Sequence, residues 1–427
     1  MERHAVVVGA GPAGLAAALA LRARGVRVTL LERAGAAGGR GRDEAVDGPA
    51  AAAPLVGAGD AALAALLERA GAAQPRPATF ALWRGGKLEP LAPAGAVARV
   101  RAALARARLE RIERRFAALL DRDAPERAAR FDDRSAAAMA RLYLPRAALA
   151  ADVAPLTAGL GLGDAEEASR VPALLLRRSL AQPPRVLRGA VDALAAAATR
   201  DCELRFGGEV ERVESAGARV RVRTASGATL ECDAVVVATP ADAARRLAEP
   251  LLTTPERDVL ARTRYAPALA LHAALERAPA PRATRVLVPA EAALPVAWLD
   301  LAPAGTHAPQ SGGLATLVAG AEWSRAHLGA PDDAVAKELS SLLARLVPGS
   351  ARELRLTRVV RHERAFPLFP VGRYRELARF RRVQSDRRAL GRRLYFAGDY
   401  LAEPTLEGAV RSAVRAASGL ASDLSVE

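Results

Sequence analysis

Three glycines near the start of the chain have the spacing of a phosphate-binding loop. Gly9 permits a tight turn, Gly11 lets the backbone approach a pyrophosphate, and Gly14 lets a helix pack closely against a strand. A helix that begins within this loop points about half a positive charge at the phosphates. Glu32 stands where a carboxylate accepts a hydrogen bond from a ribose hydroxyl, which selects an adenosine diphosphate without a 2′-phosphate. The predicted loop is Gly9-Ala10-Gly11-Pro12-Ala13-Gly14.

The predicted elements on both sides of this loop show whether its glycine spacing indicates a nucleotide-binding unit. Residues 5–8 are a β-branched run typical of a buried strand, and residues 15–24 are rich in helix-forming types, with Gly25 as the helix end. Residues 26–31 form a second apolar run that leads directly to Glu32. A strand, a glycine loop, a helix and a second strand followed by an acid predict a dinucleotide-binding βαβ unit.

A glycine pair next to two arginines follows the second strand. Arg33 begins this segment, and Gly38 and Gly39 carry no Cβ atom, so the backbone there can lie flat against a ligand. Arg40 and Arg42 bring fixed positive charge to a phosphate or to a ring that becomes anionic. Nicotinamide enzymes do not need this extension, whereas flavoproteins with a long bound FAD often have it. The segment therefore favours a flavin.

A lone aspartate follows the last apolar strand of the chain. Residues 394–398 have the sequence Leu-Tyr-Phe-Ala-Gly, Asp399 comes next, and a helix of small residues is expected from about Leu406. A carboxylate and a helix N-terminus thus come together almost at the end of the sequence. Because a helix N-terminus stabilises an anion by roughly 0.3–2 kcal/mol, this pair suits a ligand that gains negative charge.

Glu32 together with the Gly-Gly-Arg-x-Arg segment resembles the FAD-dependent amine oxidase superfamily, which includes flavin amine oxidases, protoporphyrinogen oxidase, phytoene desaturases and squalene-pathway flavoproteins. The resemblance extends over nearly the whole chain, with specific motifs at both ends and a looser middle. It implies an α/β fold with a Rossmann-like FAD-binding domain built on a parallel sheet. An interleaved substrate domain of antiparallel sheet and helical cap is also implied. FAD is expected to be bound non-covalently, since no cysteine follows Cys232.

The resemblance also assigns parts of FAD to the two ends of the chain. Asp399 is expected to bind the ribityl or pyrophosphate part, and the helix from Leu406 to aim its N–H groups at the pyrimidine carbonyl of the flavin. The backbone at Val210 is expected to reach the adenine. The positions implied as cofactor-binding are Gly9, Gly11, Pro12, Ala13, Gly14, Glu32, Arg33, Gly38, Gly39, Arg40, Val210, Gly398, Asp399, Leu406, Glu407, Gly408 and Ala409.

Patterning between the two ends alternates between strands and helices. Residues about 55–72 and most of residues 96–200 predict helices, whereas residues 268–363 predict an antiparallel sheet followed by a helix over 332–346. The expected domains are the first part of the FAD-binding domain at 1–95, a mainly helical cap at 96–200, the second FAD-binding part at 201–250, the substrate-domain sheet and helix at 251–375, and the C-terminal FAD-binding part at 376–427.

Several features common in the superfamily are missing from this sequence. Their absence limits the reactions that we expect of this chain. Many amine oxidases place a lysine near the flavin N5, but residues 268–310 contain none. They also build an aromatic cage, and Thr405 stands at one of its positions. The usual Asp-x-Gly after the arginines is replaced by Asp47-Gly48-Pro49. We therefore expect an FAD-dependent oxidoreductase that oxidises or desaturates a largely apolar substrate such as an isoprenoid, polyketide or tetrapyrrole. The alternatives are a flavin amine oxidase and a non-enzymatic binding protein similar to the GDP-dissociation inhibitors.

The charge and composition exclude some partners. The net charge is +15, carried almost wholly by arginines that are spread along the chain without a nucleic-acid-binding motif, so no nucleic acid is expected. Weak peripheral contact with an anionic membrane stays open. No signal peptide or apolar run long enough for a membrane span is visible, which favours the cytoplasm. Two cysteines are too few for a metal site. Oxygen and a quinone are both suitable electron acceptors for this chemistry.

No catalytic base can be assigned from the sequence. The weak candidates are His362, Tyr374 and Tyr400, because they stand close to segments expected at the flavin. His272, His307 and His327 are candidates by residue type alone, and a structural role is the commoner fate of each.

Overall fold

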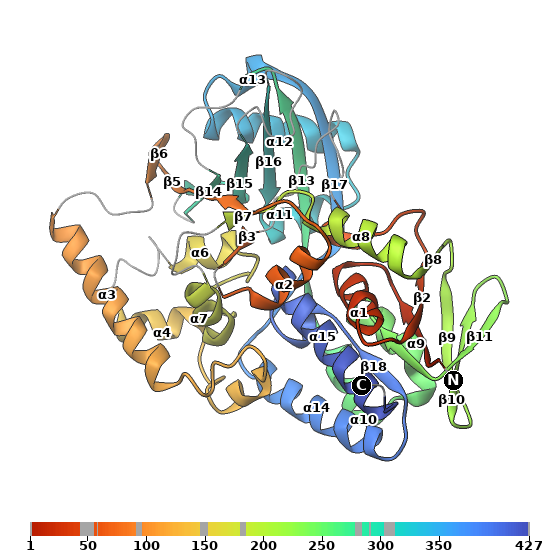
Figure 1. The fold of residues 1–427 in the computed structure, drawn as a ribbon. Helices are drawn as coiled ribbons and strands as arrows, with labels where there is room; N and C mark the ends of the chain where they lie inside the picture. Colours follow the sequence, from red (N-terminus) through yellow and green to blue (C-terminus); the bar gives the residue numbers. More distant parts are fainter. Residues whose placement is uncertain are drawn as a thin grey trace.

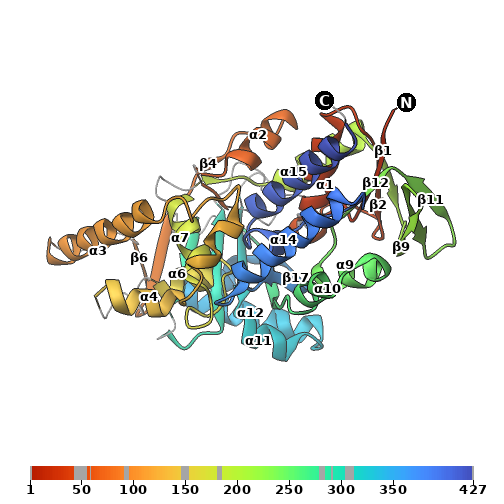
Figure 2. The same cartoon turned by 90° about the horizontal axis from the view of Figure 1, so that it is seen from below.

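The computed structural model describes residues 2–42, 55–57, 59–90, 96–145, 153–179, 185–277, 284–289, 292–302 and 312–425. Two sheets dominate it, a parallel one that contains the N-terminal strand and a larger mixed one, as Figure 1 shows. Both chain ends lie beside the parallel sheet (Figures 1 and 2). Within the described ranges, none of the helices is both long and apolar enough to cross a bilayer.

The parallel sheet has the strand order β18-β12-β1-β2-β8. Its strands are nearly continuous apolar runs because helices or further strands cover both of their faces. Alternate residues of β1 therefore enter different cores: Val7 packs with the helices on one face, and Val6 packs with the elements on the other. The bounds are β1 His4–Val8, β2 Arg27–Glu32, β8 Glu203–Phe206, β12 Ala234–Val237 and β18 Leu394–Phe396.

Four helices cover one face of this sheet, and α1 and α15 lie against each other there (Figure 1). The other face is covered by the antiparallel sheet β9-β10-β11 and by α9, α10 and α14. The helices are α1 Pro12–Arg22, α2 Ala61–Arg69, α8 Ala190–Asp201, α15 Leu406–Asp423, α9 Ala241–Ala248, α10 Thr254–Ala261 and α14 Arg373–Ala389. The strands of the small sheet are β9 Val210–Ala216, β10 Arg219–Thr224 and β11 Thr229–Cys232.

The second large sheet has the order β17-β13-β16-β15-β14-β5-β6. One face packs against α12, with α11 and α13 nearby. The strands are β5 Phe80–Arg84, β6 Lys87–Pro90, β13 Tyr265–Leu275, β14 Arg285–Leu287, β15 Val296–Ala302, β16 Gly313–Ala319 and β17 Leu354–Pro367. The helices are α11 Ala321–His327, α12 Asp332–Leu346 and α13 Ser350–Glu353.

A group of helices lies beside the second sheet, and Figure 2 shows α3 extending away from the rest of the molecule. A small sheet of order β3-β7-β4 lies between this group and the parallel-sheet domain (Figure 1). The helices are α3 Ala96–Arg115, η2 Pro125–Arg130, α4 Ala136–Tyr143, α6 Ala154–Gly159 and α7 Arg170–Ser179. The strands are β3 Leu55–Val56, β4 Arg76–Pro77 and β7 Arg185–Val186.

The α/β architecture expected from the sequence is confirmed, including the helix at Asp332–Leu346. The helix expected over about 55–72 is shorter than predicted, because Leu55–Val56 pairs with β7 as a strand and α2 begins only at Ala61. The substrate-domain sheet is antiparallel except where β14 pairs with β5 in parallel. Since β5 and β6 join this sheet, it crosses the domain boundary predicted at residue 95.

Candidate active site

The glycine loop between β1 and α1 has the geometry that its sequence predicts. Gly9 has φ +97°, a left-handed conformation that favours glycine, and its N–H donates to Leu31 O at 2.8 Å. A Cβ on Gly14 would lie 1.7 Å from Gly9 O, so only glycine allows α1 to pack this closely on the loop. A Cβ on Gly11 would meet nothing within 4 Å. Gly11 thus borders open space at the start of α1, with Pro12 and Ala13 in the first turn.

Glu32 closes the loop from the end of β2. Its carboxylate accepts hydrogen bonds from Ala10 N at 2.7 Å and Ala34 N at 2.9 Å, so both chain segments that flank the open space are tied to it. Gly208 N donates to the backbone oxygen of Glu32 at 3.0 Å. This places the start of β9, including the buried Val210, beside Glu32. The two segments expected at the adenosine half of FAD therefore lie together.

The paired glycines lie directly over the first loop. Gly38 N donates to Ala10 O at 2.8 Å, and a Cβ on Gly39 would lie 3.1 Å from Gly11 Cα. Both have positive φ, +112° and +52° respectively. This close backbone packing explains why two residues without a Cβ atom stand here. Arg33, by contrast, is exposed, and its placement gives it no evident contact with the loop.

The two ends of the chain meet through Arg40 and Asp399. Arg40 Nη2 donates to both carboxylate oxygens of Asp399 at 2.9 Å, and Arg40 Nη1 donates to Ala365 O at 2.7 Å. The Asp399 side chain is 12% exposed. Burial works against the charged guanidinium, but the Asp399 carboxylate more than offsets it and raises the pKa of Arg40. A fixed ion pair thus lies between the glycine loops and the end of β18.

The helix that follows Asp399 begins at the predicted residue. Thr405 is its N-cap, and the Thr405 hydroxyl accepts a hydrogen bond from Gly408 N at 2.9 Å. A Cβ on Gly408 would lie 2.2 Å from Glu403 O, so the loop before α15 crosses directly over its first turn. Leu406 and Thr405 border a cavity, while Gly398, Glu407 and Ala409 are buried.

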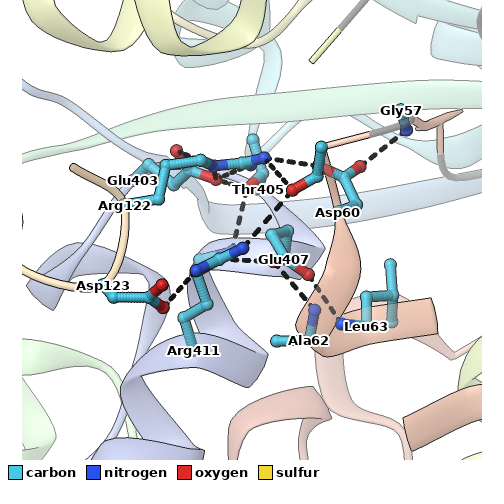
Figure 3. A network of polar contacts seen from close by, with 12 residues as sticks. Gly57, Asp60, Ala62, Leu63, Arg122, Asp123, Glu403, Thr405, Glu407 and Arg411 are labelled. Carbon is cyan, nitrogen blue, oxygen red and sulfur yellow. Dashed lines mark hydrogen bonds and ion pairs between the residues drawn. The ribbon is translucent and has the colours of Figure 1, made fainter. Parts of the chain in front are cut away.

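Arg122 anchors that loop to the rest of the molecule, as Figure 3 shows. It donates to Asp60 Oδ1 at 2.7 Å and, through Nε, to both carboxylate oxygens of Glu403 at 3.1 Å. Thr405 Oγ1 also donates to Glu403 Oε1 at 2.8 Å. Asp60 precedes α2, Glu403 precedes α15, and Arg122 comes from the helical cap. One cation therefore joins three segments at the N-terminus of α15.

Glu407 lies in the same network and points toward α2 (Figure 3). Its carboxylate accepts from Leu63 N at 2.7 Å and Ala62 N at 3.3 Å, so it satisfies N–H groups in the first turn of α2. Burial raises the pKa of Glu407, and Arg411, which contacts it, opposes that effect. The Glu407 side chain is thus used in the fold. Its backbone and that of Leu406 form the first turn of α15.

A cavity of about 300 Å³ opens beside Arg40 and the start of α15. Its floor is the free face of the second large sheet, and its other walls come from the helical cap and the loop before α15. Most of the lining side chains are apolar; they include Leu160, Leu176, Val191, Ala268, Ala270, Trp298, Val318, Val360, Ala365 and Phe366. The lining acids Asp60 and Asp300 are both paired with arginines.

The three weak candidates for a catalytic base are in different places. His362 lines the cavity. Tyr374 is fully buried and donates to Ala402 O at 3.1 Å, and Tyr400 is buried in the core beneath Asp399. Burial raises the pKa of both tyrosines well above the ordinary value, so they remain neutral. Only His362 among them borders the cavity.

The other histidines considered as candidates also lie in different parts of the structure. His272 lines the cavity floor, whereas His327 stacks on Trp323 in α11 with ring centroids 4.0 Å apart. His307 lies outside the described residues, and so does Asp47-Gly48-Pro49, the segment that replaces the usual Asp-x-Gly.

The residues around the glycine loops, Arg40 and the start of α15 fit an extended FAD. The open space at Gly11 and the N-terminus of α1 suit the pyrophosphate, Glu32 suits the ribose, and Arg40 with the first turn of α15 suits the flavin end next to the cavity. The partial positive charge at the N-terminus of α15 would stabilise negative charge at that end.

Sequence reasoning missed Arg122, Asp60 and Glu403. They contact one another across 62 and 281 sequence positions, and two of them precede helices at which they look like ordinary capping residues. The one local signal was a second acid, Glu403, close to Asp399 in a short loop.

Known structures share the overall fold of this chain. Solved structures of similar fold include cyclohexylamine oxidase from Brevibacterium oxydans IH-35A, at 19% identity and TM-score 0.73 over 100% of both chains. They also include a putative protoporphyrinogen oxidase from Exiguobacterium sp. 255-15, at 16% identity and TM-score 0.74 over 100% of this chain and 99% of that one. A fatty acid isomerase from P. acnes has 15% identity and TM-score 0.69, with 96% and 97% covered.

A search of the curated proteins found no match. The model of the family described as flavin containing amine oxidoreductase matches residues 12–421, which include the phosphate loop's helix, the Arg40–Asp399 pair and most of α15. The chain belongs to the flavin-containing amine oxidoreductase family and is an FAD-dependent oxidoreductase.

Proposed function

We propose that this enzyme oxidises or desaturates a largely apolar organic molecule of the isoprenoid, polyketide or tetrapyrrole kind. The observation that carries the proposal is the lining of the cavity beside Arg40 and α15. Apolar side chains of the sheet floor and the cap dominate it, and they would exclude water from a bound hydrocarbon segment. FAD, when bound, supplies the chemistry by accepting a hydride equivalent from a substrate carbon.

The residues around the cavity have separate tasks in this proposal. The sheet floor, with Ala268, Ala270 and Val318, orients the substrate, and the helical cap covers it through Leu160 and Leu176. The first turn of α15 holds partial positive charge where the reduced cofactor would carry negative charge, while Asp399 balances the charge of Arg40. Arg122 and Arg411 offset charges of the nearby carboxylates, so the positive end of the α15 dipole is not cancelled locally.

An amine oxidase is the second candidate, because the matching family is described by that chemistry. Two observations weigh against it. The acids that line the cavity, Asp60 and Asp300, are held by Arg122 and Arg285, and the lining contains no lysine. Thr405 occupies the position before α15 where many amine oxidases of the superfamily have an aromatic cage residue.

Anaerobic reduction separates these two candidates. Purified holoenzyme is mixed without oxygen with isoprenoid, polyketide and tetrapyrrole compounds, and in parallel with primary and secondary amines. Loss of the oxidised flavin absorbance with the apolar compounds supports the proposal. Loss with amines alone would replace it by amine oxidation.

We also propose oxygen or a quinone as electron acceptor, and a location in the cytoplasm with weak contact to anionic membranes. The net charge of +15 supports the membrane contact. Reoxidation of the reduced enzyme by aerated buffer and by a soluble quinone, followed by stopped-flow absorbance, distinguishes the acceptors. Co-sedimentation with phosphatidylserine vesicles at low and high salt tests the membrane contact.

A further inference from the structure

One row of polar side chains crosses the cavity face of the second large sheet. Directly paired residues from neighbouring strands share a face, with Cβ atoms about 4.5–5.5 Å apart. The register pairs Asp300 with Arg285 and Thr316, and pairs His272 with Thr316 and Arg358. These five residues, one from each of β14, β15, β16, β13 and β17, are called the polar row.

Apolar rows flank the polar row on both sides. On the side nearer the contact between Arg40 and Ala365, the register aligns Leu287, Trp298, Val318, Ala270 and Val360. On the other side it aligns Ala302, Leu314, Ala274 and Leu356. Placing polar groups in such surroundings costs free energy unless they are hydrogen-bonded. The polar row therefore requires an explanation beyond the packing of the sheet.

Two of the five residues in the polar row, Arg285 and Asp300, have a structural role. Arg285 donates to the two carboxylate oxygens of Asp300 at 2.7 and 2.8 Å and to Gly159 O at 3.2 Å, which ties α6 to the sheet. Trp298 Nε1 also donates to Asp300, at 3.2 Å. The charges of Arg285 and Asp300 thus offset each other, and their hydrogen bonds are used within the protein.

The next two residues of the polar row, Thr316 and His272, lie side by side in the lining of the cavity. His272 is 5% exposed and lines the cavity, and within the described part of the chain its buried Nδ1 has no hydrogen-bond partner. Thr316, the neighbour of His272 in the row, is 6% exposed and lines the cavity as well. An imidazole with a nitrogen unpartnered among the described residues and a threonine thus stand side by side in the lining of this cavity.

The surroundings of His272 are positively charged. The pKa of His272 is lowered to about 4, mainly by burial and then by the charges of Arg358, His362 and Arg188 in that order. His272 is therefore neutral near pH 7, while two arginines contribute positive potential around it. A neutral imidazole, a hydroxyl and nearby guanidinium groups are a donor set suited to a carboxylate.

We propose that the polar row binds the carboxylate of an amphipathic substrate whose apolar chain extends across the neighbouring apolar row toward Arg40. This deepens the proposed function and rests on it, since the same cavity must hold the oxidised segment. His272 and Thr316 contact the carboxylate, and Arg358 attracts it. The substrate class is then an acid with a long hydrocarbon portion rather than a plain hydrocarbon.

The test measures binding of decanoate, 1-decanol and decylamine to holoenzyme through the shift they cause in the flavin spectrum. We expect decanoate to bind at least about tenfold more tightly than the other two, because a hydrogen bond to a charged group is stronger than one between neutral groups. In His272→Leu and Thr316→Val this preference should fall about tenfold. Thr357→Val is the control, since Thr357 pairs with Ala273 on the opposite face of the sheet.

Equal binding of the three compounds to wild-type enzyme would overturn the proposal. So would a preference for decanoate that survives both substitutions. Flavin content shows whether each variant is folded, and Thr316→Val removes only the hydroxyl if His272→Leu fails to fold. A decanoate preference without oxidation of any apolar compound would contradict the proposed function alone, and oxidation without the preference would contradict the polar-row site alone.

Discussion

Arg40 donates both hydrogen bonds of one terminal nitrogen to Asp399, 359 positions further along the chain. This pair joins the end of the glycine-rich segment to the end of β18, beside the first turn of α15. Because Arg40 also holds the backbone oxygens of Arg364 and Ala365, it fixes the end of β17 against the same point. The cofactor elements and the substrate sheet thus share one anchoring side chain.

The glycines of the first loop should respond differently to alanine. Gly11→Ala places a methyl group in open space with φ −73°, so stability of the apoprotein should be unchanged while FAD affinity falls about tenfold or more. Gly14→Ala drives a Cβ into Gly9 O and should lower the free energy of unfolding by about 1–3 kcal/mol. Urea unfolding and FAD fluorescence titration measure the two quantities. Equal losses of stability in Gly11→Ala and Gly14→Ala would contradict the conclusion that Gly11 borders open space.

Arg122 should be important for stability beyond what a surface ion pair provides. Arg122→Met leaves Asp60 and Glu403, 7% and 2% exposed, without their cation, and we expect a loss of about 3–5 kcal/mol in the free energy of unfolding. Arg127→Met is the matched control, because the Arg127 side chain is 60% exposed and its pair should contribute less than about 1 kcal/mol. Similar losses in the two variants would show that the network in Figure 3 is not anchoring α15.

His272 should make the protein sensitive to acid. An unfolded histidine takes up a proton near pH 6.5, whereas burial keeps the pKa of His272 at about 4. Between these values the unfolded state binds more protons, so stability falls as the pH is lowered from 6.5 to 4, by about 3 kcal/mol from this group. His272→Leu should lose correspondingly less over the same range. Urea unfolding at a series of pH values measures this. If the free energy of unfolding falls equally in wild type and variant between pH 6.5 and 4, the expectation is contradicted.

Filling the cavity should block the substrate and leave the cofactor in place. Ala270→Phe projects a ring over the floor between Val318 and Val360, so kcat/KM for an apolar substrate should fall about tenfold or more, which corresponds to 1.4 kcal/mol. FAD affinity should not change. Ala270→Ser, which keeps the volume small, is the control. An unchanged kcat/KM in Ala270→Phe would show that the substrate does not bind in this cavity.

The cofactor-binding loop could be predicted because its signals are local. A strand, closely spaced glycines and a helix are encoded within residues 4–32, and the main features of the N-terminal unit appear as expected. The start of α15 at Leu406 was likewise visible from a polar loop before a run of small residues. The sequence also predicted that these two regions belong to one site, and the Arg40–Asp399 contact agrees with that expectation.

The polar row and the Arg122 network depend on tertiary register and could not be predicted in the same way. Three strands of the floor carry one such polar residue within an apolar run: His272 in β13, Asp300 in β15 and Thr316 in β16. The sequence of a single strand does not determine which residue of the neighbouring strand lies opposite each of its own. The repeated single polar residue was the available signal, and it becomes informative only once the strands are aligned.

FAD titration of wild type, Arg40→Met and Asp399→Asn tests the central claim most directly. We predict one FAD per chain in the wild type and dissociation constants about 10–100-fold higher in the two variants, because each removes a charged hydrogen-bonding partner at the flavin end. Asp423→Asn, which alters the pair with Arg388 at the far end of α15, should bind FAD as the wild type does. A protein that stays colourless after FAD is added, or Arg40 and Asp399 variants with wild-type affinity, would contradict a cofactor held between the two ends of the chain.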